Sequence, residues 1–213
     1  GEFVNIKGWA VLFHPDLLHG THLEQTIKDY SFFDYSINEA LHMSNEEHET
    51  LVSLIRQIRD EITSNKHDEI QNTIIVGFLE VMLNYCRRFY NRQFLTRKIE
   101  NTDLLKKFSK LLYEYFDEGK QLSLGIPTVQ YCADKLCASA NYFGDLIKKS
   151  IGETASHYIR RHIIQLAKNK LASGETINQT AYELGFEYPQ HFSRMFKRCT
   201  GITPKEYISS LSN

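Results

Sequence analysis

The chain has 213 residues, 42% hydrophobic and 24% charged, which excludes a disordered chain and allows one or two ordinary hydrophobic cores. Its formal net charge of −1 combines an acidic part, with 13 Lys or Arg against 19 Asp or Glu in residues 1–119, and a basic part, with 12 against 7 in residues 120–213. We expect a soluble, cytoplasmic protein, because no apolar run approaches the roughly 20 residues of a membrane span and no secretory leader begins the chain.

The first residues predict short strands in a piece of a longer protein. The chain begins Gly1-Glu2-Phe3 without an initiating methionine, so we expect that a natural N-terminus has been removed. The apolar run at 9–13, ended by Pro15, predicts a buried strand, and the aromatic run at 32–35 predicts another.

An amphipathic helix is predicted at 45–64. Ser44 is the expected N-cap, and Glu47 three residues later completes a capping box. The apolar residues recur at helical spacing on one face. They are Leu51, Leu54, Ile55, Ile58 and Ile62.

A longer helix, predicted at 68–92, is apolar over more than one face. Its apolar residues are Ile74, Ile75, Phe78, Leu79, Val81, Met82, Tyr85, Cys86 and Phe89. We expect part of this surface to form a homodimer contact, and burial between neighbouring helices of the same chain is the alternative.

A third helix is predicted at 104–115, and the looser segments 119–121 and 125–127 are interpreted as a linker. We therefore divide the chain at 119/120. Residues 1–119 are expected to be a partial sensor or dimerisation module, and residues 120–213 a separate, basic domain.

The basic part repeats itself. Lys148, Gly152, Thr154 and Tyr158 recur as Lys197, Gly201, Thr203 and Tyr207, each displaced by 49 residues, while Ala133 and Leu136 recur displaced by 48 as Ala181 and Leu184. A repeat that keeps its register across a one-residue slip indicates two copies of one supersecondary unit with turns of different length. Each copy is predicted to be a helix-turn-helix.

The second helix of each copy has an apolar and a polar face. Apolar side chains at i, i+3 and i+4 predict the buried stripe. The buried stripes are Phe143, Leu146 and Ile147, and then Phe192, Met195 and Phe196. The opposite, exposed stripes are Asn141, Gly144, Asp145 and Lys148, and then Gln190, Ser193, Arg194 and Lys197.

Glycines and threonines mark the ends of these helices. Gly185 is expected to make the turn of the second copy at positive φ. Gly152 and Gly201 are expected C-caps, with Thr154 and Thr203 as N-caps of the helices that follow.

The stretch from Ala181 to Phe186, then His191 to Arg198 and Gly201 to Tyr207, closely resembles the signature of the AraC/XylS family of bacterial transcription regulators. The resemblance covers about residues 123–210. It implies a mainly α fold, in which two helix-turn-helix units are joined by a long helix at about 154–172 and are preceded by a helical module with a few residual β-strands. In that family an N-terminal sensor is often a cupin-like barrel, and residues 8–15 look like the end of one.

The resemblance implies a function in which the second helix of each unit enters the major groove of duplex DNA. Position by position, it places Asn141, Gly144 and Asp145 at base-facing positions of the first unit, and Pro189, Gln190 and Arg194 at those of the second. We expect Arg194 to read guanine O6 and N7 and Gln190 to read adenine. The expected phosphate contacts are Lys148, Lys149, Lys197 and Arg198, for each of which an ordinary solvated charge is the alternative.

The first copy departs from the family pattern at two positions. An arginine often found at the position of Asp145 is absent, and Cys137 stands where the second copy has Gly185. The base readout of the first copy is therefore expected to be weaker than that of the second.

Other chemistry is sparse in the sequence. His14, His19 and His22 lack the pattern of a zinc site, the four cysteines lack C-x-x-C spacing, and no catalytic motif occurs, so we expect no enzyme, metal or cofactor. Expected partners are double-stranded DNA, a second copy of the chain, and RNA polymerase, and no membrane. Two alternatives stay open, a helical protein-interaction module and a DNA-repair-type enzyme with a reactive thiol.

Overall fold

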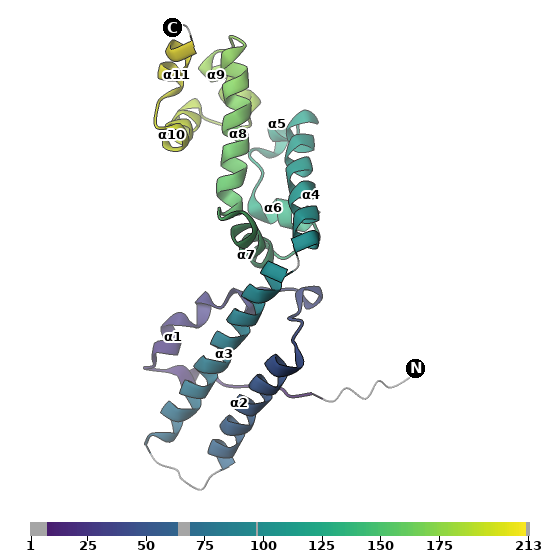
Figure 1. The fold of residues 1–213 in the computed structure, drawn as a ribbon. Helices are drawn as coiled ribbons and strands as arrows, with labels where there is room; N and C mark the ends of the chain where they lie inside the picture. The colour runs from purple at the N-terminus through teal and green to yellow at the C-terminus, as the bar shows by residue number, and fades with distance from the viewer. Residues whose placement is uncertain (1–7, 64–68, 97, 212–213) are drawn as a thin grey trace. The chain divides into compact units, whose positions relative to one another are not determined.

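The computed structural model describes residues 8–63, 69–96 and 98–211, which are mainly helical and contain no β-strand (Figure 1). The chain folds as two compact units that divide between Thr96 and Arg97. No helix among the described residues is long and apolar enough to cross a membrane.

The N-terminal unit is built on an antiparallel pair of helices, α2 (Asn45–Thr63) and α3 (Gln71–Thr96) (Figure 1). The expected start of the first helix at 45 is confirmed, whereas α3 begins at Gln71 and continues past the expected end at 92 to Thr96. The expected bounds at 64 and 68 lie outside the described residues. Short helical turns precede this pair: η1 (Pro15–Leu18), α1 (His22–Thr26), η2 (Ile27–Asp29), η3 (Ser31–Asp34) and η4 (Ile37–Glu39). Their apolar side chains share one core with α2 and α3. Its buried residues are Leu18, Leu23, Tyr30, Leu54, Val76, Leu79, Met82 and Leu83.

The prediction of two strands was wrong. Residues 9–13 have no regular structure, and the 32–35 run enters η3. A strand needs a neighbour that takes its backbone hydrogen bonds, whereas here Phe33 N donates to Tyr30 O at 3.2 Å and Tyr35 N to Phe32 O at 3.3 Å. Some of the apolar side chains pack on helices instead, as Phe32 does by stacking on Tyr90 with ring centroids 5.6 Å apart, whereas Leu12 is 93% exposed.

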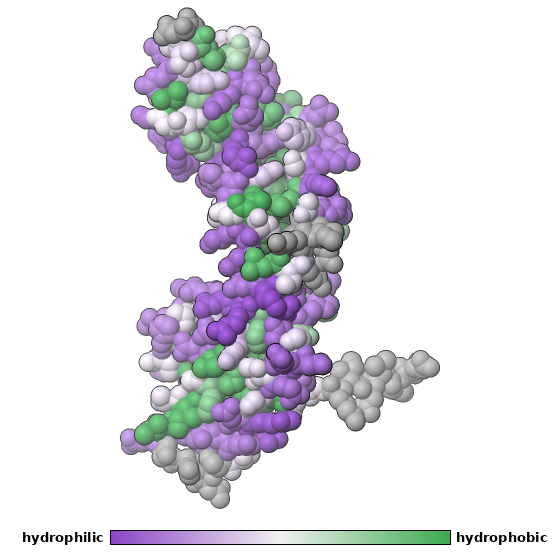
Figure 2. Space-filling model, viewed as in Figure 1, coloured by the Kyte–Doolittle hydropathy of each residue, from purple (hydrophilic) through white to green (hydrophobic). Residues whose placement is uncertain are grey.

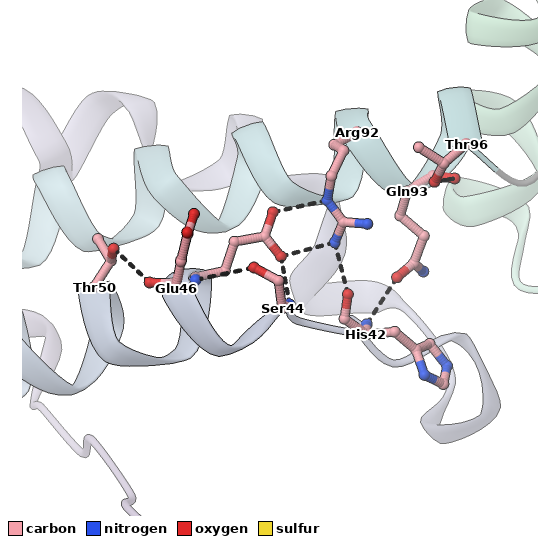
Figure 3. Close-up of polar contacts among 8 residues, drawn as sticks. His42, Ser44, Glu46, Thr50, Arg92, Gln93 and Thr96 are labelled. Carbon is pink, nitrogen blue, oxygen red and sulfur yellow. Dashed lines mark hydrogen bonds and ion pairs between the residues drawn. The ribbon is translucent and has the colours of Figure 1, made fainter.

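Polar contacts fasten the C-terminal end of α3 to the segment that leads into α2 (Figure 3). Arg92 Nε donates to Glu47 Oε1 at 2.7 Å, and its Nη2 donates to His42 O at 2.6 Å. Gln93 is 2% exposed and accepts from His42 N at 2.7 Å. Glu47 also forms the predicted capping box with Ser44, accepting from its amide at 2.9 Å and donating its own amide to the hydroxyl at 3.2 Å.

The C-terminal unit is all helical in its described part (Figure 1). It contains α4 (Lys98–Asp117), α5 (Gln121–Leu124), α6 (Val129–Lys135), α7 (Ala140–Ile151), α8 (Ala155–Ala172), α9 (Ile177–Glu183), α10 (Pro189–Thr200) and α11 (Pro204–Leu211). The long helix α8 packs against α7 at one end and against α9, α10 and α11 at the other. It agrees with the predicted long helix at 154–172.

Helix α4 belongs to this second compact unit, which begins ahead of the expected division at 119/120. The Phe108 ring lies 5.0 Å from the Phe143 ring of α7 and 4.8 Å from the Tyr158 ring of α8. Farther along α4, Tyr115 Oη donates to Gly125 O at 2.9 Å. These contacts bury one face of α4 against the helix-turn-helix repeat. The short helix α5 begins within the first of the two segments interpreted as a linker, 119–121, and ends before the second, 125–127.

Candidate DNA-binding interface

The first helix-turn-helix consists of α6, a turn and α7. Thr128 and Ser139 cap the two helices, accepting from Tyr131 N at 3.1 Å and from Tyr142 N at 3.3 Å. In the turn, Cys137 N donates to Asp134 O at 3.2 Å and Ala138 N to Ala133 O at 3.0 Å, and Cys137 takes the left-handed conformation with φ 56°.

The second helix-turn-helix, α9, turn and α10, has the same turn displaced by 48 residues. Gly185 N donates to Tyr182 O and Phe186 N to Ala181 O, both at 3.0 Å, and Gly185 has φ 84°. The predicted positive φ of this glycine is therefore confirmed. Pro189 begins α10 at a position where its missing amide hydrogen costs nothing.

The buried stripes of both second helices are confirmed. Phe143, Ile147, Phe192 and Phe196 are 0% exposed, and Leu146 and Met195 are buried beside them. Burying a side chain of this size contributes about 1.5–3 kcal/mol, so these stripes fix how α7 and α10 rotate about their own axes. The opposite faces are thereby held toward solvent.

The predicted contact residues lie on those opposite faces. Those in α7 come from its first two turns and its last turn, and those in α10 are spaced in the same way. Asn141, Lys148, Lys149, Gln190, Arg194, Lys197 and Arg198 are exposed, and Gly144, Asp145, Pro189 and Ser193 are half-buried. The repeat thus presents two similar polar faces within one compact unit.

The basic residues at the ends of these helices have a local role as well. Lys148 and Lys149 lie in the last turn of α7, and Lys197 and Arg198 in the last turn of α10. Positive charge there is favourable because the C-terminal end of a helix dipole is negative. Gly152 and Gly201 then end the helices in the predicted left-handed C-cap conformation.

Polar contacts stabilise the N-terminal ends of α8 and α11. Thr154 caps α8 by accepting from His157 N at 3.2 Å. Although burial acts to raise it, the pKa of Glu153 is lowered by hydrogen bonds from Arg161 and His157. Thr203 forms a reciprocal cap with Glu206, whose amide donates to the threonine hydroxyl at 3.2 Å.

The structure adds polar residues that sequence reasoning missed. Tyr188 and His191 are exposed at the start of α10, with ring centroids 5.5 Å apart. Arg161 and Lys168 of α8 line a groove that also contains Thr200 of α10. Tyr188 and His191 could have been found from the sequence, because they flank Pro189 and Gln190. The groove could not, because it depends on the packing of α8 against α10.

The buried thiol of Cys132 and the half-buried thiol of Cys86 both have raised pKa values. Burial raises the pKa of Cys132 to about 12 and also raises the pKa of Cys86, whereas a reactive cysteine needs a lowered one. All four cysteines are free, and Cys137 and Cys199 are exposed. Within the ranges that the structure describes, no group of three or more His, Cys, Asp or Glu side chains is placed to hold a metal ion.

Comparison with known sequences points to gene regulation. A family model described as a helix-turn-helix domain matches residues 132–210. The transcriptional regulatory protein YesN of Bacillus subtilis is 35% identical over 77 residues, which are 35% of this chain and 21% of that protein. The HTH-type transcriptional regulator AlkR of Acinetobacter baylyi is 33% identical over 81 residues, 38% of this chain and 26% of that protein.

A longer match leads to an HTH-type transcriptional regulator of Staphylococcus aureus, 25% identical over 150 residues, which are 68% of this chain and 19% of that protein. The chain spans about a fifth to a quarter of the length of these curated relatives.

Two solved structures resemble the chain in part. The C-terminal domain of AraT, a response regulator from Geobacillus stearothermophilus, aligns with a TM-score of 0.43 and 22% identity over 50% of this chain and 84% of that one. The C-terminal domain of the two-component response regulator YesN from Fusobacterium nucleatum aligns with a TM-score of 0.40 and 27% identity over 47% of this chain and 96% of that one.

Proposed function

We propose that residues 132–210 are the DNA-binding helix-turn-helix domain of an AraC-type transcription regulator, and that this chain inserts α7 and α10 into successive major grooves of duplex DNA. Grooves on one face of the duplex recur every 34 to 36 Å or so. The observation that carries the proposal is the pair of equivalent turns, at Cys137 and Gly185, each followed by a helix with a buried apolar face and a polar face toward solvent.

The second unit is proposed as the main reader of sequence. Arg194 is exposed on α10, and its guanidinium suits the paired acceptors O6 and N7 of guanine. Gln190 lies one turn earlier on the same face and can both donate to and accept from adenine. Pro189 and Ser193, which directly precede Gln190 and Arg194, would contact the edge of the groove.

The first unit is proposed to contribute more to position than to discrimination. Gly144 has no side chain, and the carboxylate of Asp145 is repelled by phosphate, although it can accept from cytosine N4. Asn141 is the remaining exposed base-facing residue. Lys148 and Lys149 would contact phosphates, and so would Lys197 and Arg198 in the second unit.

The experiment that tests this function is selection of bound duplexes from a random pool. We expect an enriched site with two parts whose centres lie about 10 base pairs apart, one helical turn of DNA. The matched control is the chain carrying both Gln190→Ala and Arg194→Ala, which should lose enrichment of one part and keep weak, salt-sensitive binding. No enrichment with the unmodified chain would contradict the proposal.

We also propose that the N-terminal unit dimerises through an exposed strip of α3 and the turn before it. The strip contains Ile70, Ile74 and Val81, which are 61%, 37% and 44% exposed. Gly77 lies within the same strip and is also exposed, with nothing within 4 Å of where a Cβ would stand. Figure 2 shows a band of apolar surface where Figure 1 draws the first half of α3.

A helix of a second copy could approach closely at Gly77, because glycine places no side chain between two backbones. Dimerisation would join two DNA-binding units and raise their effective concentration on a paired site. We further propose that this regulator acts in the bacterial cytoplasm and contacts RNA polymerase through a face that is not occupied by DNA.

A further inference from the structure

An open cavity of about 760 Å³ lies between α4, α5, α8 and α9, away from the polar faces of α7 and α10. This volume is in the range of sites that hold small organic molecules. Its walls are mostly apolar or aromatic. They include Tyr113, Phe116, Leu122, His162, Leu166 and Leu184.

The aromatic wall is preformed. His162 packs edge-on against Tyr113, with ring centroids 4.7 Å apart, and lies 5.8 Å from the Phe116 ring. Burial and the nearby positive charge of Arg161 lower the pKa of His162, so its imidazole is neutral at pH 7. A neutral imidazole between two rings forms a surface for a flat apolar group, and it adds no positive charge to the cavity.

The charge at the rim is net negative. Lys170 is the only cation among the lining residues, and it is already bonded to Glu175 at 3.2 Å and to Glu183. Glu114 pairs with Lys110 at 3.4 Å. The Asp117 carboxylate lines the cavity, is exposed, and forms no ion pair or hydrogen bond with any described residue.

Two further lining residues contain buried polar atoms without a hydrogen-bond partner among the described residues. These atoms are Gln121 Oε1 and His162 Nε2. Gln121 is only 8% exposed, and its Nε2 donates to Glu183 O at 2.9 Å, so the side chain is held at the cavity while its oxygen remains unused. Buried polar atoms without a hydrogen-bond partner are uncommon in folded proteins and are costly, and the Gln121 oxygen can only accept.

We propose that this cavity binds a small molecule with an aromatic body and a cationic amine head. The ring would lie against Tyr113, Phe116 and His162. The ammonium group would be near Asp117, because an ammonium donates three hydrogen bonds, accepts none, and suits the unused acceptors of the site, the Asp117 carboxylate and the Gln121 oxygen. An anionic ligand of the same shape would be repelled by the carboxylates of the rim.

Occupancy of the cavity bears on the second helix-turn-helix. Glu183 and Leu184 line the cavity and directly precede Gly185, the turn residue between α9 and α10. Gln121 connects the opposite wall to Glu183 O. A ligand here would therefore contact α5 and the end of α9, just before the turn that positions α10, the proposed main reader.

The test uses phenethylamine as the cationic probe and 3-phenylpropionate as its anionic counterpart, with binding followed by NMR shifts of backbone amides in the full chain. A probe of this size is expected to bind with a dissociation constant on the order of millimolar. Phenethylamine should shift the amides around Tyr113, Gln121, His162 and Glu183, and 3-phenylpropionate should not. Equal shifts with both probes, or none with phenethylamine, would overturn the proposal.

Variants locate the site. Asp117→Asn should weaken phenethylamine binding about two- to five-fold, the effect of an exposed ion pair, while Asp103→Asn on the same helix but outside the cavity should not. Asn169→Trp places an indole at the exposed rim and should abolish the shifts while circular dichroism keeps its helical signal. Shifts that survive Asn169→Trp would place binding elsewhere. None of these measurements requires DNA, so failure here leaves the proposed function standing.

Discussion

The backbone oxygen of Gln121 lies 2.7 Å from the point where a Cβ on Gly185 would stand. Cβ atoms essentially never come this close to another heavy atom, so α5 and the turn of the second helix-turn-helix can pack in this way only with glycine at 185. The φ of 84° independently requires a residue that tolerates the left-handed region.

Gly185→Ala should therefore destabilise the chain more than the same substitution at a left-handed position with open space around the Cβ. We expect a loss of about 2 to 5 kcal/mol, combining left-handed strain with the displacement of α5. Gly201→Ala is the matched control, because Gly201 also has φ 84° but open space around its Cβ position. That control should lose only about 1 to 2 kcal/mol. Urea unfolding followed by circular dichroism measures both, and equal losses would show that the contact with Gln121 is unimportant.

Cys137 makes the equivalent turn of the first unit without the freedom of glycine. Its φ of 56° costs a non-glycine residue about 1 to 2 kcal/mol, and the side chain is exposed. Cys137→Gly should thus raise the free energy of unfolding by up to about 1 kcal/mol, once the greater freedom of glycine in the unfolded chain is subtracted. Cys199→Gly, at an exposed position in the last turn of α10, should lower it, because glycine is a poorer helix former. A decrease for both variants would contradict the assigned strain.

Local features of the sequence predicted much of the C-terminal unit. The capping roles of Thr154 and Gly201 and the buried stripe at Phe192 and Phe196 depend on residues within one or two helical turns of each other. These features can be predicted without knowledge of the tertiary structure, because hydrogen bonds at helix ends and helical periodicity depend only on nearby residues.

Features that depend on distant contacts were not predictable in this way. The aromatic run at Phe32 is typical of a strand, but Tyr90 of α3 supplies its packing partner and no neighbouring strand is present among the described residues. Helix α4 was placed in the wrong compact unit because nothing near Phe108 in the sequence indicates its contacts with Phe143 and Tyr158. The cavity beside Gln121 likewise exists only once four helices have packed.

The division of roles on α10 is tested with two alanine variants. Arg194→Ala should cost about 1 to 3 kcal/mol on the selected site and relax preference at one base pair, because it removes a paired contact to a base. Lys197→Ala should weaken selected and scrambled duplexes similarly, because a phosphate contact carries no sequence information. Fluorescence anisotropy with both duplexes measures the difference, and equal loss on both for Arg194→Ala would refute base reading by that residue.

The proposed dimer predicts a concentration-dependent mass in sedimentation. At tens of micromolar, roughly the range of weak protein interfaces, the unmodified chain should contain dimer. Val81→Arg should shift it to monomer, because a charge would be buried against apolar surface. Ile62→Arg is the control, since Ile62 is 55% exposed on α2 and lies outside the proposed strip. A clean monomer for the unmodified chain would exclude dimerisation through α3 in this range.

Asp145 decides whether the first unit reads bases. If its carboxylate faces phosphates without accepting a hydrogen bond from a base, Asp145→Ala should leave DNA affinity unchanged or raise it. The gain should be largest at low salt, where repulsion is least screened.

The control for that variant is Asp134→Ala. Asp134 is an exposed carboxylate of α6 that is already hydrogen-bonded to Gln130 at 2.7 Å, outside the helix proposed to enter the groove. Asp134→Ala should leave affinity nearly unchanged at every salt concentration. If Asp145→Ala instead abolishes recognition of one half of the selected site, then Asp145 accepts from cytosine N4, the first unit discriminates sequence, and the ranking that places α10 first is wrong.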